Sequence, residues 1–157
     1  MEKCIHYAFI DAQNLHVSLR REGIAINYKK FRRYLAEKYK VKKVFSFIGY
    51  IQEYEDIYQS LKEVGYELIF KTTTNRGKDT KGNCDSDLIM QVVREWKNFE
   101  KAIIISGDGG FLPLIKYLKE NNKLLKIGIP TMKSRSYLLK KYKKETFFIE
   151  RLLDKIH

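Results

Sequence analysis

The chain has 157 residues, a length that suits one domain, residues 1–157, able to bury about 70% of the surface exposed by its unfolded form. Its longest uncharged run, residues 44–52, is far shorter than the roughly 20 apolar residues that span a bilayer, and the N-terminus lacks a signal-peptide pattern. Cys4 and Cys84 lie far apart without the spacing of a zinc site, so the sequence predicts a cytoplasmic protein that needs no disulfide and no membrane.

Strand-like and helix-like segments alternate along the chain with short connections. Strands are predicted at residues 5–10, 43–51, 66–70, 102–106 and 124–129, with a further edge strand at 146–149. Helices are predicted at residues 14–21, 28–39, 54–64, 84–98, 111–121 and 136–142, followed by a last short helix. Such alternation produces right-handed βαβ crossovers. The predicted fold class is therefore α/β, with a central mostly parallel sheet of about five strands covered by helices on both faces.

The formal net charge is +12, and the positive charge is unevenly distributed. Residues 116–157 hold twelve basic and four acidic side chains, and residues 29–43 hold eight basic side chains and one acidic one. A lysine-rich solvated surface is one interpretation. A polyanion partner is the other, because clustered positive charge with a pI near 9.6 is typical of nucleic-acid binding. Five tyrosines among these cations either stack on unpaired bases or pack in the core: Tyr28, Tyr34, Tyr39, Tyr137 and Tyr142.

Three aspartates stand where predicted strands end or a helix begins. Asp11 follows the first strand, Asp108 follows the fourth within a glycine-rich turn, and Asp85 lies at the start of the helix 84–98. Parallel sheets bind ligands beyond the carboxyl ends of their strands, so Asp11 and Asp108 share one crevice if their strands are neighbours. The apolar stripe of the helix 84–98 consists of Ile89, Val92, Val93 and Trp96. Helical spacing places Asp85 on this stripe and Asp87 on the polar face.

Each aspartate also has a local structural role open to it. Asp108 could cap the following helix, Asp11 could open an Asx turn, and Asp85 or Asp87 could favour the positive end of a helix dipole. Together, however, three carboxylates in one crevice of low dielectric repel each other unless a cation or protons neutralise them. Oxygen ligands select hard ions, so the predicted cofactor is Mg²⁺ or Mn²⁺. The sequence carries no Rossmann glycine pattern, no P-loop and no credible Ser-His-Asp set.

The segments 9–14, 81–88 and 106–111, in this order and spacing, resemble the NYN domain family, the LabA-like branch of the PIN-domain-like ribonucleases. The resemblance covers nearly the whole chain. It implies a PIN-like three-layer α/β/α fold, with Asp11, Asp85 and Asp108 as metal ligands. It also implies that Asn14 holds the first acid or the scissile phosphate. The implied activity is metal-dependent hydrolysis of phosphodiester bonds, and RNA is favoured over DNA on this ground alone.

One position departs from the family pattern S-G-D-x-D-F, because Gly110 stands where the second acid is expected. Asp87 is a possible additional acid if the start of its helix is irregular. Two functions therefore stay open, a metal-dependent ribonuclease and a noncatalytic or weakly catalytic RNA-binding module. The oligomeric state, including a homo-oligomer, is open as well.

The predicted loop 71–81 carries four cations and one acid and enters the same edge of the sheet. We expect Arg76, Lys78 and Lys81 to contact the phosphate backbone of a nucleic acid. An ordinary surface loop is the alternative.

Overall fold

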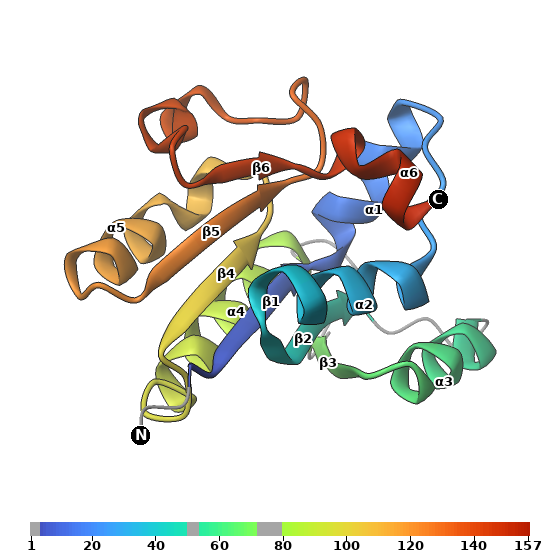
Figure 1. The fold of residues 1–157 in the computed structure, drawn as a ribbon, viewed down its shortest axis with the longest axis horizontal. Helices are drawn as coiled ribbons and strands as arrows, with labels where there is room; N and C mark the ends of the chain where they lie inside the picture. Colours follow the sequence, from blue (N-terminus) through green and yellow to red (C-terminus); the bar gives the residue numbers. More distant parts are fainter. Residues whose placement is uncertain (1–3, 50–53, 72–79) are drawn as a thin grey trace.

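The computed structural model describes residues 4–49, 54–71 and 80–157 of the chain. Its centre is a six-stranded sheet with the order β3-β2-β1-β4-β5-β6, in which every pair of neighbours is parallel (Figure 1). The strands are β1 (His6–Asp11), β2 (Val41–Gly49), β3 (Tyr66–Lys71), β4 (Lys101–Ile105), β5 (Leu124–Ile129) and β6 (Thr146–Phe148). The predicted α/β class is confirmed, and the expected edge strand is the sixth member of the sheet.

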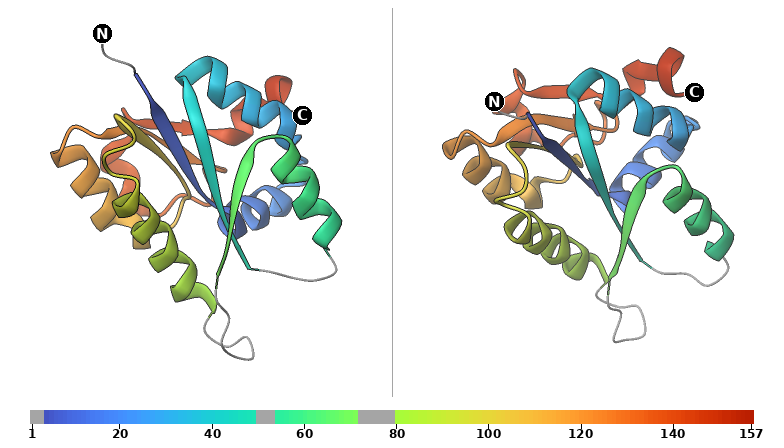
Figure 2. Two further views of the ribbon diagram at one scale, coloured as in Figure 1. Left: turned by 90° about the horizontal axis from the view of Figure 1, so that it is seen from below. Right: turned by 60° about the horizontal axis from the view of Figure 1, so that its bottom comes forward.

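Helices cover both faces of this sheet (Figure 2). One layer consists of α1 (Ala12–Arg21), α2 (Tyr28–Tyr39), α3 (Glu55–Glu63) and α6 (Leu153–Ile156). The other consists of α4 (Thr80–Arg94), α5 (Leu112–Glu120) and the 3-10 helix η3 (Tyr137–Tyr142). Two further 3-10 turns are η2 (Gly109–Phe111) and η4 (Ile149–Leu152). The three layers agree with the PIN-like α/β/α fold that the resemblance implies.

The two cores follow from the alternation of side chains along each strand. In β1, Phe9 packs in the core beneath α4 and α5, whereas Ile10 packs in the core beneath α1 and α2. All four residues from Ala102 to Ile105 of β4 are 0% exposed. A continuous apolar run of this kind is expected for a parallel strand covered on both faces.

The strand order reverses between β1 and β4. From β1 the chain adds β2 and β3 on one side, then returns to place β4 against the other side of β1. In this pair Ile10 lies opposite Ile105, so the two strands end side by side. Open parallel sheets have their ligand crevice at such a reversal, beyond the carboxyl ends of the strands. Asp11 ends β1 and Asp108 follows β4, so the predicted neighbourhood of their strands is confirmed.

Helix α4 differs from the sequence prediction in its start and in its buried face. It begins at Thr80 rather than Cys84, so Asp85 lies in the second turn and not at the helix start. A glycine such as Gly82 weakens a helix by about 1 kcal/mol relative to Ala, so local preference at this position favours a loop. Packing of the later turns of α4 on the sheet nevertheless stabilises the whole helix. The predicted stripe was wrong at Val93, which is 54% exposed, whereas Leu88 is 0% exposed.

The loop predicted from residue 71 is also shorter than expected. Lys71 is the last residue of β3 and is buried. No helix within the described ranges is long and apolar enough to cross a bilayer.

Candidate metal centre

Asp11 connects the end of β1 to the start of α1 and is 7% exposed. Its Oδ1 accepts a hydrogen bond from the backbone N–H of Asn14 at 3.2 Å, and its Oδ2 accepts one from the Ser106 hydroxyl at 3.2 Å. Asp11 thus caps α1, whereas the local role considered for it from the sequence was an Asx turn. Both carboxylate oxygens are held in place, one by its own helix and one by the neighbouring strand.

Asp108 is held in a similar way beyond the end of β4. Its Oδ1 accepts a hydrogen bond from the backbone N–H of Gly110 at 2.9 Å and so caps η2. Its own backbone N–H donates to Oγ of Ser106 at 3.1 Å. Ser106, which is 1% exposed, thus contacts both aspartates.

Asn14 holds the loop that carries Asp108. Its side-chain Oδ1 accepts a hydrogen bond from the backbone N–H of Gly107 at 2.9 Å. A Cβ atom at Gly107 would lie 2.6 Å from the carbonyl oxygen of Ser134, so this loop is confined on its other side as well. Asn14 therefore contacts Asp11 through its backbone, while its side-chain amide fixes the loop after β4.

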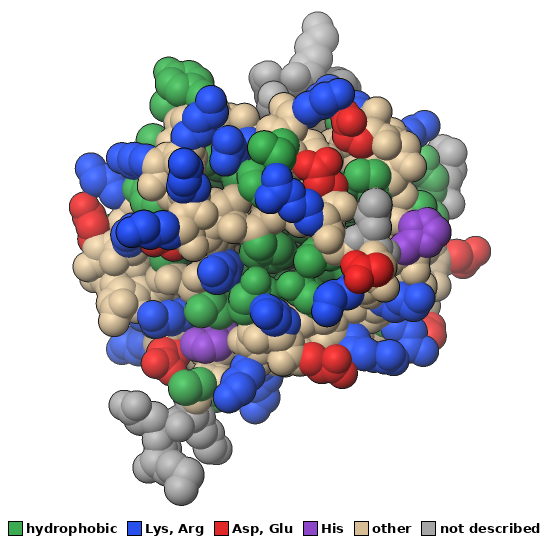
Figure 3. Space-filling view, turned by 45° about the horizontal axis from the view of Figure 1, so that its top comes forward, with side chains coloured by type: hydrophobic (Ala, Val, Ile, Leu, Met, Phe, Trp, Pro, Cys, Tyr) green, Lys and Arg blue, Asp and Glu red, His purple; other side chains and the backbone are tan. Residues whose placement is uncertain are grey.

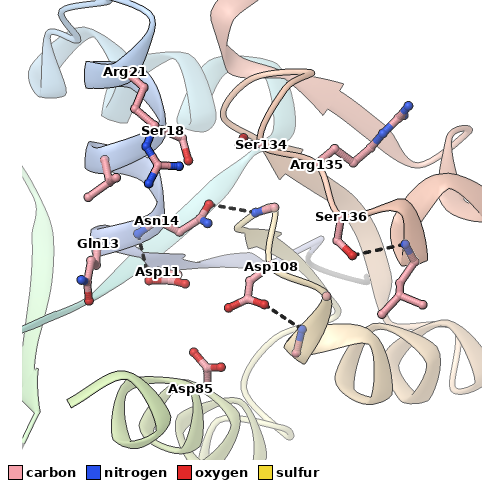
Figure 4. A pocket seen from close by; sticks show the side chains of 15 residues that line it. Asp11, Gln13, Asn14, Ser18, Arg21, Asp85, Asp108, Ser134, Arg135 and Ser136 are labelled. Atoms are coloured by element: carbon pink, nitrogen blue, oxygen red, sulfur yellow. Dashed lines mark hydrogen bonds between the residues drawn. The ribbon is translucent and has the colours of Figure 1, made fainter. Parts of the chain in front are cut away.

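Asp85 completes a group of three carboxylates. One oxygen atom from each of Asp11, Asp85 and Asp108 lies within 4.8 Å of the others, and Asp85 reaches the group from α4 (Figure 4). Helical spacing thus placed Asp85 correctly toward the sheet. Asp87 is half-buried and is not a member of this group among the described residues.

Gly110 borders the same group. A Cβ atom at this position would lie 3.2 Å from Oδ2 of Asp85 and 3.4 Å from Oδ1 of Asp108. A side chain at position 110 would therefore point at the carboxylates. The departure from the family pattern removes an acid from the site itself.

The electrostatics of the group favour a cation. Burial raises the pKa of the Asp11 carboxyl, and the charge of Asp108 raises it further. Hydrogen bonds from Asn14 and Ser106 and the charge of Lys71 lower this pKa without offsetting the burial. Because the ligands are oxygen atoms that repel each other when ionised, they fit a hard divalent ion. The predicted ions, Mg²⁺ and Mn²⁺, are among the hard ions that carboxylates bind.

A cleft of about 600 Å³ extends from the carboxylates along α1. Asn14, Ser18 and Arg21 line it at spacings of four and three residues, which place them on one face of the helix. The guanidinium group of Arg21 points along the cleft toward Asn14, whereas that of Arg135 points away from the carboxylates (Figure 4). Arg135 instead lies over the Phe148 ring, 5.4 Å from its centroid. The helical period of α1 was the signal that could have identified Ser18 and Arg21.

Two of the three residues predicted to contact phosphate lie outside the described part of the chain. Arg76 and Lys78 fall outside the described residues, and Lys81 lies in the first turn of α4. Of the five tyrosines near the basic clusters, Tyr142 is buried and Tyr137 is 75% exposed. Tyr28, Tyr34 and Tyr39 are half-buried and make aromatic ring contacts.

Lysine and arginine side chains are spread across the face around β6, with acidic side chains between them (Figure 3). This face therefore does not present one continuous block of positive charge.

One known structure supports the fold. A protein of unknown function, VPA0982 from Vibrio parahaemolyticus, is similar to this chain with a TM-score of 0.82 and 18% sequence identity, and all of both chains is covered. A glucose-6-phosphate dehydrogenase in complex with glucose-6-phosphate matches with a TM-score of 0.38 and 10% identity, over 94% of this chain and 36% of the enzyme. The likeness to the Vibrio protein bears on the fold alone. No curated protein is similar enough in sequence to count as a relative.

The sequence itself identifies the family. The profile of the NYN domain matches residues 7–150 and so spans β1 to the end of the sheet. The three carboxylates lie within the matched region. The match concerns the family as a whole, and the LabA-like branch stays a prediction. The chain belongs to the NYN domain family, which is PIN-like and nuclease-like.

Proposed function

We propose that this protein is a metal-dependent ribonuclease that hydrolyses RNA phosphodiester bonds. The reaction site lies beyond the carboxyl ends of β1 and β4, where the strand order of the sheet reverses. The observation that carries the proposal is the gathering of Asp11, Asp85 and Asp108 within 4.8 Å, in a chain of the NYN domain family. The three residues come from β1, α4 and the loop after β4, so the fold itself brings them together.

Asp11, Asp85 and Asp108 would hold Mg²⁺ or Mn²⁺. With such an ion bound, the site gains Lewis-acid polarisation of a phosphate and a more acidic water as nucleophile. The protein's own contribution is to fix the ligands before substrate arrives. The Ser106 hydroxyl and the Asn14 N–H orient Asp11, and the Gly110 N–H orients Asp108. Ligands held by such partners bind metal more tightly than mobile ones.

The cleft supports a single-stranded substrate. Arg21 follows Asn14 by seven residues on α1, a rise of about 10 Å along the helix. A phosphate near the carboxylates and a neighbouring phosphate near Arg21 would both lie within the cleft. Arg76 and Lys78, which precede α4, and Lys81, in its first turn, would add contacts to the phosphate backbone of the RNA. RNA rather than DNA is proposed from the family resemblance.

The second candidate function is a noncatalytic RNA-binding module, and Gly110 is the observation that favours it. An acid at this position would join the carboxylate group, so the chain has one ligand fewer than the family pattern provides. Gly110→Asp tests whether the missing acid limits activity. The variant should cleave faster than the wild-type protein if the wild-type protein is a nuclease limited by metal affinity.

The test is cleavage of a labelled single-stranded RNA in Mn²⁺, in Mg²⁺ and in EDTA. We expect cutting in the metals and none in EDTA. Asp11→Asn and Asp108→Asn should abolish it while RNA affinity is kept. Asp154→Asn, which changes an exposed acid on α6, is the matched control and should cut normally. Tight RNA binding by the wild-type protein without cutting in any metal would establish the binding module instead.

A further inference from the structure

A buried lysine approaches the carboxylates from the far side of β2. Lys71 ends β3 and is 8% exposed, although lysine is almost never fully buried unless its charge is paired. Ile69, two residues earlier, packs in the core beneath α4, as do Phe9 in β1 and Phe47 in β2. Because side chains alternate along a strand, the positions two residues further on face the same layer. Lys71 and Asp11 therefore lie on one face of the sheet, at the same edge.

Gly49 provides the path between them. It is the residue of β2 paired with Lys71, and it faces the same layer. A Cβ atom at Gly49 would lie 2.9 Å from Cε of Lys71 and 3.6 Å from its Nζ. The lysine side chain thus crosses β2 in the space that a side chain at position 49 would fill. β1, β2 and β3 run side by side toward the start of α4 (Figure 2).

The charge of Lys71 acts on the metal centre. The positive charge of Lys71 interacts electrostatically with the Asp11 carboxylate. Three carboxylates and one ammonium leave a net charge of −2 on the group, which one divalent ion neutralises. A fourth acid at position 110 in the absence of the lysine would instead leave −4, the charge that two such ions balance.

We propose that Lys71 is a fixed positive charge of the metal centre, so that the site binds a single divalent ion. This inference rests on the proposed function, since it assumes that the carboxylates bind metal. The Lys71 ammonium neutralises part of the carboxylate charge that a second ion would otherwise neutralise. It is a positioning residue, because it acts on the reaction through the ligands.

The experiment is a titration of metal-free protein with Mn²⁺, without RNA, in which the electron paramagnetic resonance of free Mn²⁺ reports binding. We expect one ion per wild-type chain. Lys71→Met should bind the ion about tenfold more tightly, because a like charge near the ion is removed. Lys71→Arg keeps the charge and should retain the wild-type affinity. Lys116→Met, at an exposed position on α5, controls for the change in overall charge.

Two further variants keep the test sharp. The double variant Gly110→Asp with Lys71→Met should bind a second ion. Gly49→Ala leaves every charge in place but displaces the lysine side chain, and so should tighten Mn²⁺ binding even if Lys71→Met does not fold.

Equal affinities in the wild type, Lys71→Met and Gly49→Ala, or two ions per wild-type chain, would overturn the inference and leave the proposed function standing. No Mn²⁺ binding by the wild type or by the double variant would overturn both.

Discussion

The Ser106 hydroxyl donates a hydrogen bond to Oδ2 of Asp11 at 3.2 Å, and this contact joins the ends of the two central strands at the candidate metal centre. Oγ of Ser106 also accepts a hydrogen bond from the backbone N–H of Asp108 at 3.1 Å. One buried hydroxyl group therefore sets the positions of two of the three proposed ligands.

Ser106→Ala should weaken Mn²⁺ binding by roughly tenfold, because partners of metal ligands contribute to affinity on this scale. It should also lower the free energy of unfolding by about 1 kcal/mol, since two buried hydrogen bonds lose their partner. A Mn²⁺ titration and chemical denaturation measure the two effects. Ser60→Ala, at an exposed site on α3, should change neither. Unchanged Mn²⁺ affinity in Ser106→Ala would show that the contact does not organise the site.

Asp11→Asn should make the metal-free protein more stable. Burial raises the pKa of Asp11 above its ordinary value of 3.8, so the protonated form is favoured in the folded state. The protonated Asp11 carboxyl contributes to stability below pH 3.8, and this contribution is lost as the pH rises through the folded-state pKa of Asp11. At neutral pH the ionised carboxylate therefore destabilises the fold, and an asparagine does not. Removing about 1 kcal/mol of this destabilisation corresponds to a rise in Tm of roughly 2–4 °C for a chain of this size.

Thermal unfolding in EDTA and in Mn²⁺ measures this effect. The advantage of Asp11→Asn in EDTA should shrink as the pH is lowered toward 4, and Mn²⁺ should raise the Tm of the wild type alone. A variant that is less stable than the wild type in EDTA at pH 7 would contradict the role of the buried charge.

His6 should make stability fall in mild acid. Its Nδ1 accepts a hydrogen bond from the backbone N–H of Lys101 at 3.2 Å, which requires this nitrogen to be unprotonated. Burial lowers the pKa of His6 from 6.5, so the unfolded chain takes up a proton first as the pH falls. The stability due to His6 is complete above pH 6.5 and is lost below it.

The free energy of unfolding of His6→Gln, compared with the wild type between pH 7.5 and 5, measures this contribution. The variant keeps an acceptor and should show the flatter profile. His16→Gln, at an exposed position on α1, should follow the wild type. Identical profiles for His6→Gln and the wild type would remove His6 from the acid response.

Arg21→Ala should weaken binding of single-stranded RNA and lower the dependence of log affinity on log salt by about 0.7, the value for one phosphate contact. Arg21 lines the cleft of the candidate metal centre, whereas Arg20 lines a separate, smaller pocket with His16 and Tyr28. Arg20→Ala is therefore the matched control, with the same loss of charge one residue away. Fluorescence anisotropy in EDTA measures affinity without cleavage. Equal losses in both variants would indicate a general charge effect.

The sequence predicted the parts of the site that depend on local pattern. Apolar runs ending in Asp11 and before Asp108 identified two central strands, and helical spacing turned Asp85 toward them. Lys71 was read as part of a polar loop, because nothing local indicates that a lysine crosses a glycine on the next strand. That contact depends on the pairing of Gly49 with Lys71, which the register between β2 and β3 determines. The exposure of Val93 likewise depends on how α4 is rotated against the sheet.

The loop after β4 is held from two directions. Asn14 binds the N–H of Gly107, and the carbonyl oxygen of Gly107 accepts the backbone N–H of Ser136 at 2.9 Å. All three carboxylates precede residue 109 in the chain, yet one of them is set by a segment that follows β5. A fragment that stopped before β5 would contain every proposed ligand and lack the clamp that aligns Asp108. We therefore expect metal affinity to report whether the chain from β5 onward has docked against the loop after β4.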